Sequence, residues 1–300
     1  MSQPRCPSCD HPVGVGDGYC AVCGHALALP PRDRTQHAEG PVAVASDVGR
    51  RRARNEDAYA VATAAARAAV VVCDGVSSTP HADRAAALAS RAAGRVLAAG
   101  IGRSAALGDD GARALLADAV AAAQEAVAPL AWLDASGEAP STTLVAAVLH
   151  DEGITVATVG DSRAYWVPAD GSEGVVTQDD AETEVSLAVG AGAGDPLPLH
   201  RRLTRWIGGD AVGDPPRTTS VHAPGPGTLV LCSDGLWQYF DAPGQLAAEV
   251  RAAAAVGPVT LARQLLDAAL AAGGGDNVTV AVLRVDPAPL ARTGRGEARS

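Results

Sequence analysis

The sequence contains no lysine, so all 24 basic residues are arginine, and 34 acidic residues give a formal net charge of -10. An acidic chain repels nucleic-acid phosphates and anionic lipid headgroups, which argues against either as the main partner. Aromatic residues make up only 3% of the chain. No apolar run approaches the roughly 18 residues of a membrane span, and the N-terminal MSQPRCPSCD has no signal-peptide core. We therefore expect a cytoplasmic protein with no nucleic-acid and no membrane partner.

The chain has ample apolar content for a sizeable core, since 47% of its 300 residues are hydrophobic. No G-x-G-x-x-G motif opens a helix after a strand, so a dinucleotide-binding fold is not expected. Runs of β-branched and short apolar residues between turn formers predict strands, namely 42–47, 58–63, 68–73, 142–149, 154–159, 164–167, 228–232 and 278–285. Alanine-rich segments predict helices near 79–99, 111–130, 243–254 and 260–271. Strands that pair with neighbours, with two long helices after the third, predict a layered antiparallel α+β fold.

The six cysteines fall into two groups. Four follow the spacing C-x2-C-x10-C-x2-C, in which four thiolates can converge tetrahedrally on one zinc ion; they are Cys6, Cys9, Cys20 and Cys23. A pair of disulfides is the alternative, and the lack of an export signal disfavours it. We expect one structural Zn2+ in a small ribbon. Cys73 and Cys232 lie within apolar runs and are expected to be buried as small hydrophobes.

Composition divides the chain into four segments. Residues 1–25 form the predicted zinc ribbon, and 26–40, with Pro-Pro and mixed charges, are predicted to be a linker. Residues 286–300 are rich in Pro, Gly and Arg without apolar periodicity, which predicts a disordered tail. The main domain is then expected over 41–285.

Acidic residues recur at the expected ends of strands. The run VVVC leads into Asp74-Gly75, and LVLC leads through Ser233 into Asp234-Gly235. Asp276 precedes the last strand, and Glu56-Asp57 precedes the second. Each alone is ordinary turn chemistry. Together they would repel one another unless hard divalent cations neutralise them, and a glycine beside an aspartate lets a backbone carbonyl approach such a cation.

The order of these motifs resembles the metal-dependent protein phosphatases, the type 2C serine/threonine phosphatase family, in its bacterial form. The resemblance covers about residues 45–285. It is carried by SDVGRRRARNEDA (46–58), CDGVSS (73–78), STT (141–143), VGDSRAY (159–165), CSDGLW (232–237) and GGDNVTV (274–280). Any one of these strings is weak evidence, whereas six in order at compatible separations are strong.

The resemblance implies a four-layer αββα sandwich, in which two antiparallel sheets carry helices outside and the metals lie at one end. It implies two Mn2+ or Mg2+ ions that activate a water to hydrolyse phosphoserine or phosphothreonine without a phosphoenzyme. It further implies that Arg52 holds the substrate phosphate and Asp57 orients a metal-bound water. The implied metal ligands are Glu56, Asp74, the carbonyl of Gly75, Asp234 and Asp276, with Asp161 as ligand of a third ion.

The chain departs from the family pattern in three places. Val76 stands where many relatives have a histidine proposed to protonate the leaving group, so that acid is unassigned. Ser77-Ser78 replace the Gly-Gly turn of many bacterial relatives, and Gln238 replaces a common supporting aspartate.

Residues 178–207 lie where the family has a mobile flap, and a helix plus a surface loop is the alternative. Asp179 and Asp180 are expected to be helix-start acids.

Three functions of different class are compatible with the sequence. The favoured one is an active phosphatase that acts on phosphorylated proteins, among them the targets of a cytoplasmic kinase. The others are a catalytically weak regulator that binds phosphoproteins, and an adaptor that captures partners through the zinc ribbon. No proposed metal ligand of the first two ions is missing from the sequence, which favours the enzyme.

Overall fold

The computed structural model describes residues 5, 11–12, 22, 34–103, 106–132, 138–171, 174–185, 199–222, 225–240, 242 and 244–285. The chain divides into two compact units, Met1–Arg34 and Thr35–Ser300. The four cysteines of the predicted zinc ribbon and the predicted tail lie outside the described residues. The fold below is that of the second unit.

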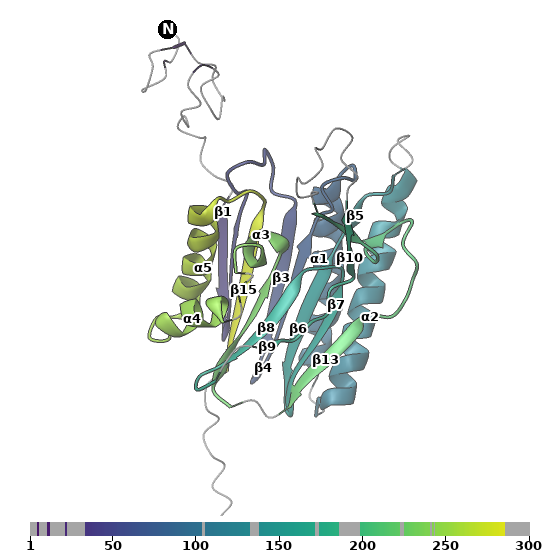
Figure 1. Cartoon of the computed structure of the whole chain (residues 1–300). Helices are drawn as coiled ribbons and strands as arrows, with labels where there is room; N and C mark the ends of the chain where they lie inside the picture. The colour runs from purple at the N-terminus through teal and green to yellow at the C-terminus, as the bar shows by residue number, and fades with distance from the viewer. Residues whose placement is uncertain are drawn as a thin grey trace, which may run out of the picture. The chain divides into compact units, whose positions relative to one another are not determined.

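Two antiparallel sheets form the centre of this unit (Figure 1). One has six strands in the order β1-β2-β15-β14-β8-β9, and the other has five in the order β13-β7-β6-β4-β3. The strands of the first sheet are β1 (Arg34–Glu39), β2 (Val42–Asp47), β8 (Arg163–Pro168), β9 (Gly174–Val175), β14 (Gly227–Cys232) and β15 (Val278–Val285). Those of the second are β3 (Asp57–Ala64), β4 (Arg67–Asp74), β6 (Leu144–His150), β7 (Gly153–Val159) and β13 (Arg217–His222).

Helices cover the outer face of each sheet, so that the unit has four layers. The helices α1 (Ala82–Ile101) and α2 (Asp109–Val127) form one hydrophobic cluster with β4, β6 and β7. The helices α3 (Asp234–Trp237), α4 (Gln245–Ala252) and α5 (Pro258–Ala272) form a second cluster with the other sheet. A third cluster fills the space between the two sheets. Figure 1 shows α5 and α1 on opposite sides of the paired sheets.

Strand β4 shows why a continuous apolar run is needed at the centre of such a sandwich. Val70 and Val72 belong to the cluster between the sheets, whereas Val71 and Cys73 face α1 and α2. All four side chains have no exposed surface. A strand that is buried on both faces cannot alternate apolar with polar residues. Strand β4 is therefore apolar up to its last residue, Asp74.

The predicted α+β class, with antiparallel sheets and helices, matches the structure. Each of the eight predicted strands lies on observed strand, although the segment predicted at 142–149 is split between β5 (Ser141–Thr142) and β6. Three differences stand out. Helix α1 begins at Ala82, not at the predicted Thr79, because His81 takes left-handed backbone angles directly before it. Strand β1 lies within the predicted linker, and the short helix α3 was not predicted.

The structure around residues 178–207 differs from the prediction that Asp179 and Asp180 begin a helix. Asp179 and Asp180 precede β10 (Ala181–Val185), which pairs with β11 (Leu199–Leu203) as an antiparallel ladder. They are therefore not helix-start acids. The short strand β12 (Ile207–Gly208) then pairs with β5. The residues of β10, AETEV, alternate, but those of β11, LHRRL, do not, so the sequence alone does not predict the pair.

None of the helices in the described part of the chain is both long and apolar enough to span a membrane.

Candidate active site

The predicted acidic residues gather at one end of the two sheets. Asp74 ends β4 and pairs directly with Asp57, the first residue of β3. Asp234 starts α3 immediately after β14 and Ser233, while Asp276 stands two residues before β15. Asp161 lies in the turn between β7 and β8. Because β14 is hydrogen-bonded to both β8 and β15, these turns all open at the same end of the sandwich.

A cavity of about 800 Å3 lies at this end. Of the predicted site residues, six line it: Arg52, Asp74, Gly75, Asp161, Asp234 and Asp276. Glu56 and Asp57 are not among the lining residues and stand directly behind them in the β3–β4 pair and the preceding loop. The rest of the lining is largely hydroxyl and charged groups, including Ser77, Ser78, Arg201 and Arg202.

The Asp57 carboxylate is held on one side only. The Ser233 hydroxyl donates to its Oδ2 at 2.8 Å, whereas its Oδ1 is buried and, among the described residues, has no hydrogen-bond partner. An unpaired buried carboxylate oxygen is costly unless a ligand or water uses it. Asp57 therefore presents one fixed oxygen and one available acceptor.

The other carboxylates are contacted by donors of the protein itself. Arg52 donates from Nη2 to Oδ2 of Asp276 at 2.6 Å. The Gln238 side-chain amide donates to Oδ2 of Asp234 at 2.7 Å, and the Asp234 backbone N–H approaches Oδ2 of Asp74 at 3.4 Å. The arginine that the sequence predicts to bind phosphate thus lies within the same acidic group.

Two glycines let backbone segments approach closely here. A Cβ on Gly75 would lie 2.7 Å from the carbonyl oxygen of Glu56, and a Cβ on Gly235 would lie 1.9 Å from that of Asn277. Neither position can accept a side chain without moving the backbone. The two Asp-Gly pairs are therefore required by packing around the aspartates, whatever they bind.

Asn277 joins the loop that carries Glu56 to the start of β15. Its side-chain amide donates to the carbonyls of Val48 and Arg54 at 2.8 and 2.9 Å. Its Oδ1 accepts the Glu56 backbone N–H at 2.8 Å. The side chain is 3% exposed and all three of its bonds cross from one part of the chain to another. Asn277 therefore fixes Glu56 beside the carboxylates.

The electrostatics of the site are those of crowded, buried acids. Burial raises the pKa of Asp74 well above its usual value, and the charges of Asp57 and Asp234 raise it further. Burial also raises the pKa of Asp234 to about 7, with a contribution from Asp276. The pKa of Asp57 rises to about 6 through burial, a rise that the nearby hydroxyls of Thr279 and Ser233 oppose. Positive charge in the cavity would relieve all three.

The donor set fits hard divalent cations, although the side chains do not converge on a single point. Among the described residues, no three His, Cys, Asp or Glu side chains are arranged to hold one metal ion together. The Arg52 and Gln238 contacts direct Asp276 and Asp234 to protein donors instead. The free Oδ1 of Asp57 and an all-oxygen, all-acidic group are nevertheless the chemistry that Mg2+ and Mn2+ require.

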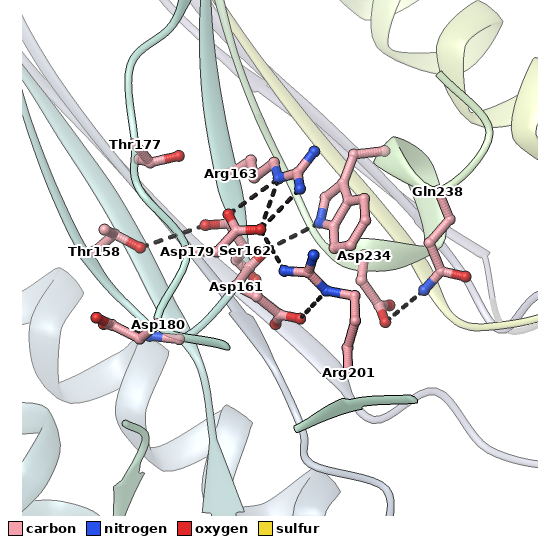
Figure 2. A network of polar contacts seen from close by, with 12 residues as sticks. Thr158, Asp161, Ser162, Arg163, Thr177, Asp179, Asp180, Arg201, Asp234 and Gln238 are labelled. Atoms are coloured by element: carbon pink, nitrogen blue, oxygen red, sulfur yellow. Dashed lines mark hydrogen bonds and ion pairs between the residues drawn. The ribbon is translucent and has the colours of Figure 1, made fainter. Parts of the chain in front are cut away.

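A network of arginines borders Asp161 (Figure 2). Arg163 and Arg201 both donate to Oδ2 of Asp179, at 2.8 and 2.5 Å respectively. Both guanidinium groups also lie over the Trp237 ring, with Cζ 3.8 and 5.0 Å from the ring centre. Arg201 Nε is 4.0 Å from Oδ2 of Asp161. Arg201 belongs to β11, so this network attaches the β10–β11 hairpin to the floor of the cavity.

Sequence reasoning missed several residues that shape the site. Ser233, Asn277 and the β11 arginines were not predicted to have roles. Ser233 and Asn277 stood inside recognised motifs, next to Asp234 and Asp276, and this adjacency was the signal that could have found them. Arg201 and Arg202 had no such signal, because only the fold brings residue 201 to Asp161.

Comparison with known proteins agrees with the geometry. Residues 49–271 match the family model described as Protein phosphatase 2C. A structure titled bacterial serine phosphatase is 21% identical with a TM-score of 0.63 and covers 84% of this chain and 99% of its own. The Staphylococcus aureus serine/threonine phosphatase Stp1 is 19% identical with a TM-score of 0.63, covering 86% of this chain and 100% of its own.

The Mycobacterium tuberculosis serine/threonine phosphatase PstP/Ppp is 26% identical with a TM-score of 0.57 and covers 82% of this chain and 98% of its own. A structure of the PstP catalytic domain, 28% identical over the same shares, is a complex with two manganese ions. No curated protein sequence gives a significant match. Because the family model spans well over half of the sequence, the chain belongs to the protein phosphatase 2C family.

Proposed function

We propose that this protein hydrolyses phosphoserine and phosphothreonine in proteins at a centre of two Mn2+ or Mg2+ ions, without a phosphoenzyme. The observation that carries the proposal is the meeting of acidic residues from five separate turns in and behind one cavity. The manganese ions in PstP support the choice of metal. Phosphorylated proteins, including targets of a cytoplasmic kinase, are the proposed substrates.

The ions would be held by oxygen ligands alone. The residues that would hold them are Asp74, the carbonyl of Gly75, Asp234, Asp276 and Glu56. When bound, the ions supply positive charge that makes water more acidic and stabilises charge developing on the phosphoryl oxygens. Arg52 now donates to Asp276, and Gln238 donates to Asp234. If these two donors moved away, the carboxylate oxygens could bind the ions.

The protein's own groups then position the reactants. Oδ1 of Asp57, which accepts no hydrogen bond from the described residues, can orient a water and take its proton, because the other oxygen is fixed by Ser233. Arg52 is 37% exposed at its side chain and lines the cavity, so its guanidinium can turn from Asp276 to a phosphate and bind two of its oxygens. The bound substrate and the β10–β11 hairpin would together exclude bulk water from the cavity.

A cysteine nucleophile does not fit the site. Cys73 and Cys232 are fully buried on β4 and β14. Burial raises the pKa of both thiols; the charges of Asp57 and Asp74 raise that of Cys73 further, whereas Arg163 only partly offsets the rise at Cys232. A thiolate is therefore disfavoured at either position. This agrees with direct attack by water on phosphorus.

The third ion and the zinc ribbon remain parts of the proposal. Asp161 is the proposed ligand of a third ion, which would compete with Arg201 for that carboxylate. Cys6, Cys9, Cys20 and Cys23 are proposed to hold one structural Zn2+ in a closed set of thiolates. Metal analysis after mild chelation should show zinc retained while manganese is lost, because four thiolates bind the softer ion more tightly. Loss of both together would contradict a closed zinc site.

The test of the activity is metal-dependent hydrolysis. Purified protein should hydrolyse p-nitrophenyl phosphate and a phosphothreonine peptide only with added Mn2+ or Mg2+. Asp74→Asn and Asp234→Asn should each lower kcat/KM at least about 100-fold, since metal ions supply several kcal/mol of transition-state stabilisation. Circular dichroism should show both variants folded. Wild-type rates in either variant, or full activity in chelator, would refute the ligand assignment.

A further inference from the structure

Strand β3 has a free edge. It is the last strand of the five-stranded sheet and, in the described part of the chain, its only ladder is with β4. The Thr63 backbone N–H donates to the Glu39 side chain at 3.1 Å, so it points away from β4. Backbone direction alternates along an antiparallel strand, so the N–H and C=O groups of Tyr59 and Val61 also point outward. Neither residue's outward groups have a partner among the described residues.

The opposite sheet extends beyond this edge. Strand β2 packs against β3, and β1 lies one strand further out in the same sheet. The Tyr59 hydroxyl reaches Thr35 of β1 at 3.4 Å, which places β1 over the space beside β3. Thr35 and His37 are exposed although they lie on a strand next to the sandwich. A sixth strand added to β3 would therefore lie beneath β1.

The helix on the other side of this position is cationic. A groove of about 430 Å3 runs between β3 and α1, with small residues such as Ala60 and Gly94 in its floor. Arg91 and Arg95 line it, both are exposed, and neither has an ion pair within the described residues. Helix α1 carries no acidic residue after Asp83. These are unneutralised cations in a chain of net charge -10.

We propose that the β3 edge binds an acidic peptide segment of a partner protein as an added strand. Backbone bonds to Tyr59 and Val61 would supply the pairing, and Arg91 and Arg95 would select acidic side chains on the face toward α1. A second copy of this chain fits less well, since edge-to-edge pairing about a two-fold axis would bring the same arginines of both copies together. The groove shares no lining residue with the 800 Å3 cavity, so docking there is separate from the proposed catalysis.

The test uses a labelled acidic peptide of strand-forming sequence, TEVEVET, and the full-length protein. Fluorescence anisotropy should show saturable binding that weakens with salt. The double variant Arg91→Glu/Arg95→Glu should bind at least about tenfold more weakly. Arg263→Glu, an exposed arginine on α5, is the matched control and should bind like wild type. All variants should retain wild-type hydrolysis of p-nitrophenyl phosphate.

Pairing with the strand is tested separately from charge. Val61→Pro removes one outward N–H and leaves the β4 ladder its donors, so it should also weaken binding at least about tenfold. Should that variant fail to fold, hydrogen exchange on the wild type replaces it, and the amides of Tyr59 and Val61 should become protected when the peptide is added. Unprotected amides, equal binding of the lysine peptide TKVKVKT, or tighter binding of oligothymidylate would each overturn the proposal.

Discussion

At the scale of single residues, Asp57 has one carboxylate oxygen held by Ser233 and one that no group in the described part of the chain contacts by a hydrogen bond. Ser233 supports this division in two ways, because its hydroxyl donates to Asp57 and accepts the backbone N–H of Thr279 at 2.9 Å. It touches the reacting region only through Asp57. We therefore regard Ser233 as a positioning residue whose effect should appear in the pH profile.

Ser233→Ala should move the acid limb of the kcat/KM profile to higher pH. The pKa of Asp57 is raised to about 6 by burial, and the hydroxyls of Thr279 and Ser233 oppose that rise. Removing the hydroxyl raises the pKa further, so the carboxylate that activity requires forms only at higher pH. The measurement is kcat/KM against pH between about 5 and 9, with Mn2+ saturating, in a range that spans the titration.

Ser90→Ala is the matched control for this variant. Ser90 is also a buried serine, but it lies on α1 and its hydroxyl donates to the carbonyl of Ala87 at 3.4 Å. Ser233→Ala should lose about 1–3 kcal/mol of stability through an unsatisfied buried group, and the control should lose no more than that. An acid limb that shifts equally in both variants would mean that Ser233 acts through general packing.

At the scale of elements, a polar cluster fixes the start of α2 to the edge of the five-stranded sheet. Asp109 accepts hydrogen bonds from Thr155, Ser220 and Arg113. His150 donates from Nε2 to Thr155 at 2.9 Å, because its Nδ1 accepts the Glu152 backbone N–H at 3.3 Å. Both ring nitrogens are therefore used by a neutral imidazole.

Acidification should destabilise this cluster through His150. Burial lowers the pKa of His150, and the charge of His222 lowers it slightly further. The nearby carboxylates oppose this shift; they are Asp109, Glu152 and Asp151. A base whose folded pKa is depressed contributes stability above its unfolded pKa and loses it as pH falls through the folded pKa. In chelated wild type, His150 should therefore lower the free energy of unfolding below about pH 6.5, a contribution that opposes the gain from the buried active-site acids and is measured by urea unfolding as the difference from His150→Gln.

His150→Gln should flatten this dependence on the acid side, while His222→Gln, which changes an exposed histidine on β13, should not. An unchanged slope in His150→Gln would show that other groups set the acid stability of this region.

The elements also show how far the sequence could be interpreted alone. Strands such as β2 and β15 were predicted with their observed bounds because buried strands need runs of β-branched and small apolar residues, which are visible in the sequence. The aspartates at Asp74 and Asp234 were found because a strand ending in Asp-Gly is visible in the sequence. Arg201 at Asp161 and the β10–β11 pairing were not, since contacts between distant segments depend on tertiary packing.

At the scale of the whole molecule, stability should depend on pH in opposite ways with and without metal. The folded-state pKa of Asp57 is raised to about 6 and that of Asp234 to about 7. Groups with raised pKa values contribute stability at low pH that is lost as pH rises through the folded pKa. Chelated protein should therefore unfold at a lower temperature at pH 8 than at pH 5.5, because the buried acids become charged.

Saturating Mn2+ should reverse this trend. A ligand at 100 times its Kd stabilises by about 2.7 kcal/mol, which for a domain of this size raises the unfolding temperature by about 5–10 °C. The gain should be largest at pH 8, where the carboxylates are ionised, and should vanish near pH 5. Tryptophan fluorescence is the suitable signal, because all four tryptophans lie between residues 132 and 237 and none lies in the predicted zinc ribbon.

Asp74→Asn provides the internal control, since it should raise the stability of the chelated protein at pH 8 and remove most of the Mn2+ gain. Both effects have one cause, which is the cost of an unneutralised charge at the end of β4. If the chelated wild type were equally stable at pH 5.5 and pH 8 and Mn2+ had no effect, the acids would not be crowded in solution, and the proposed metal centre would lose its physical basis.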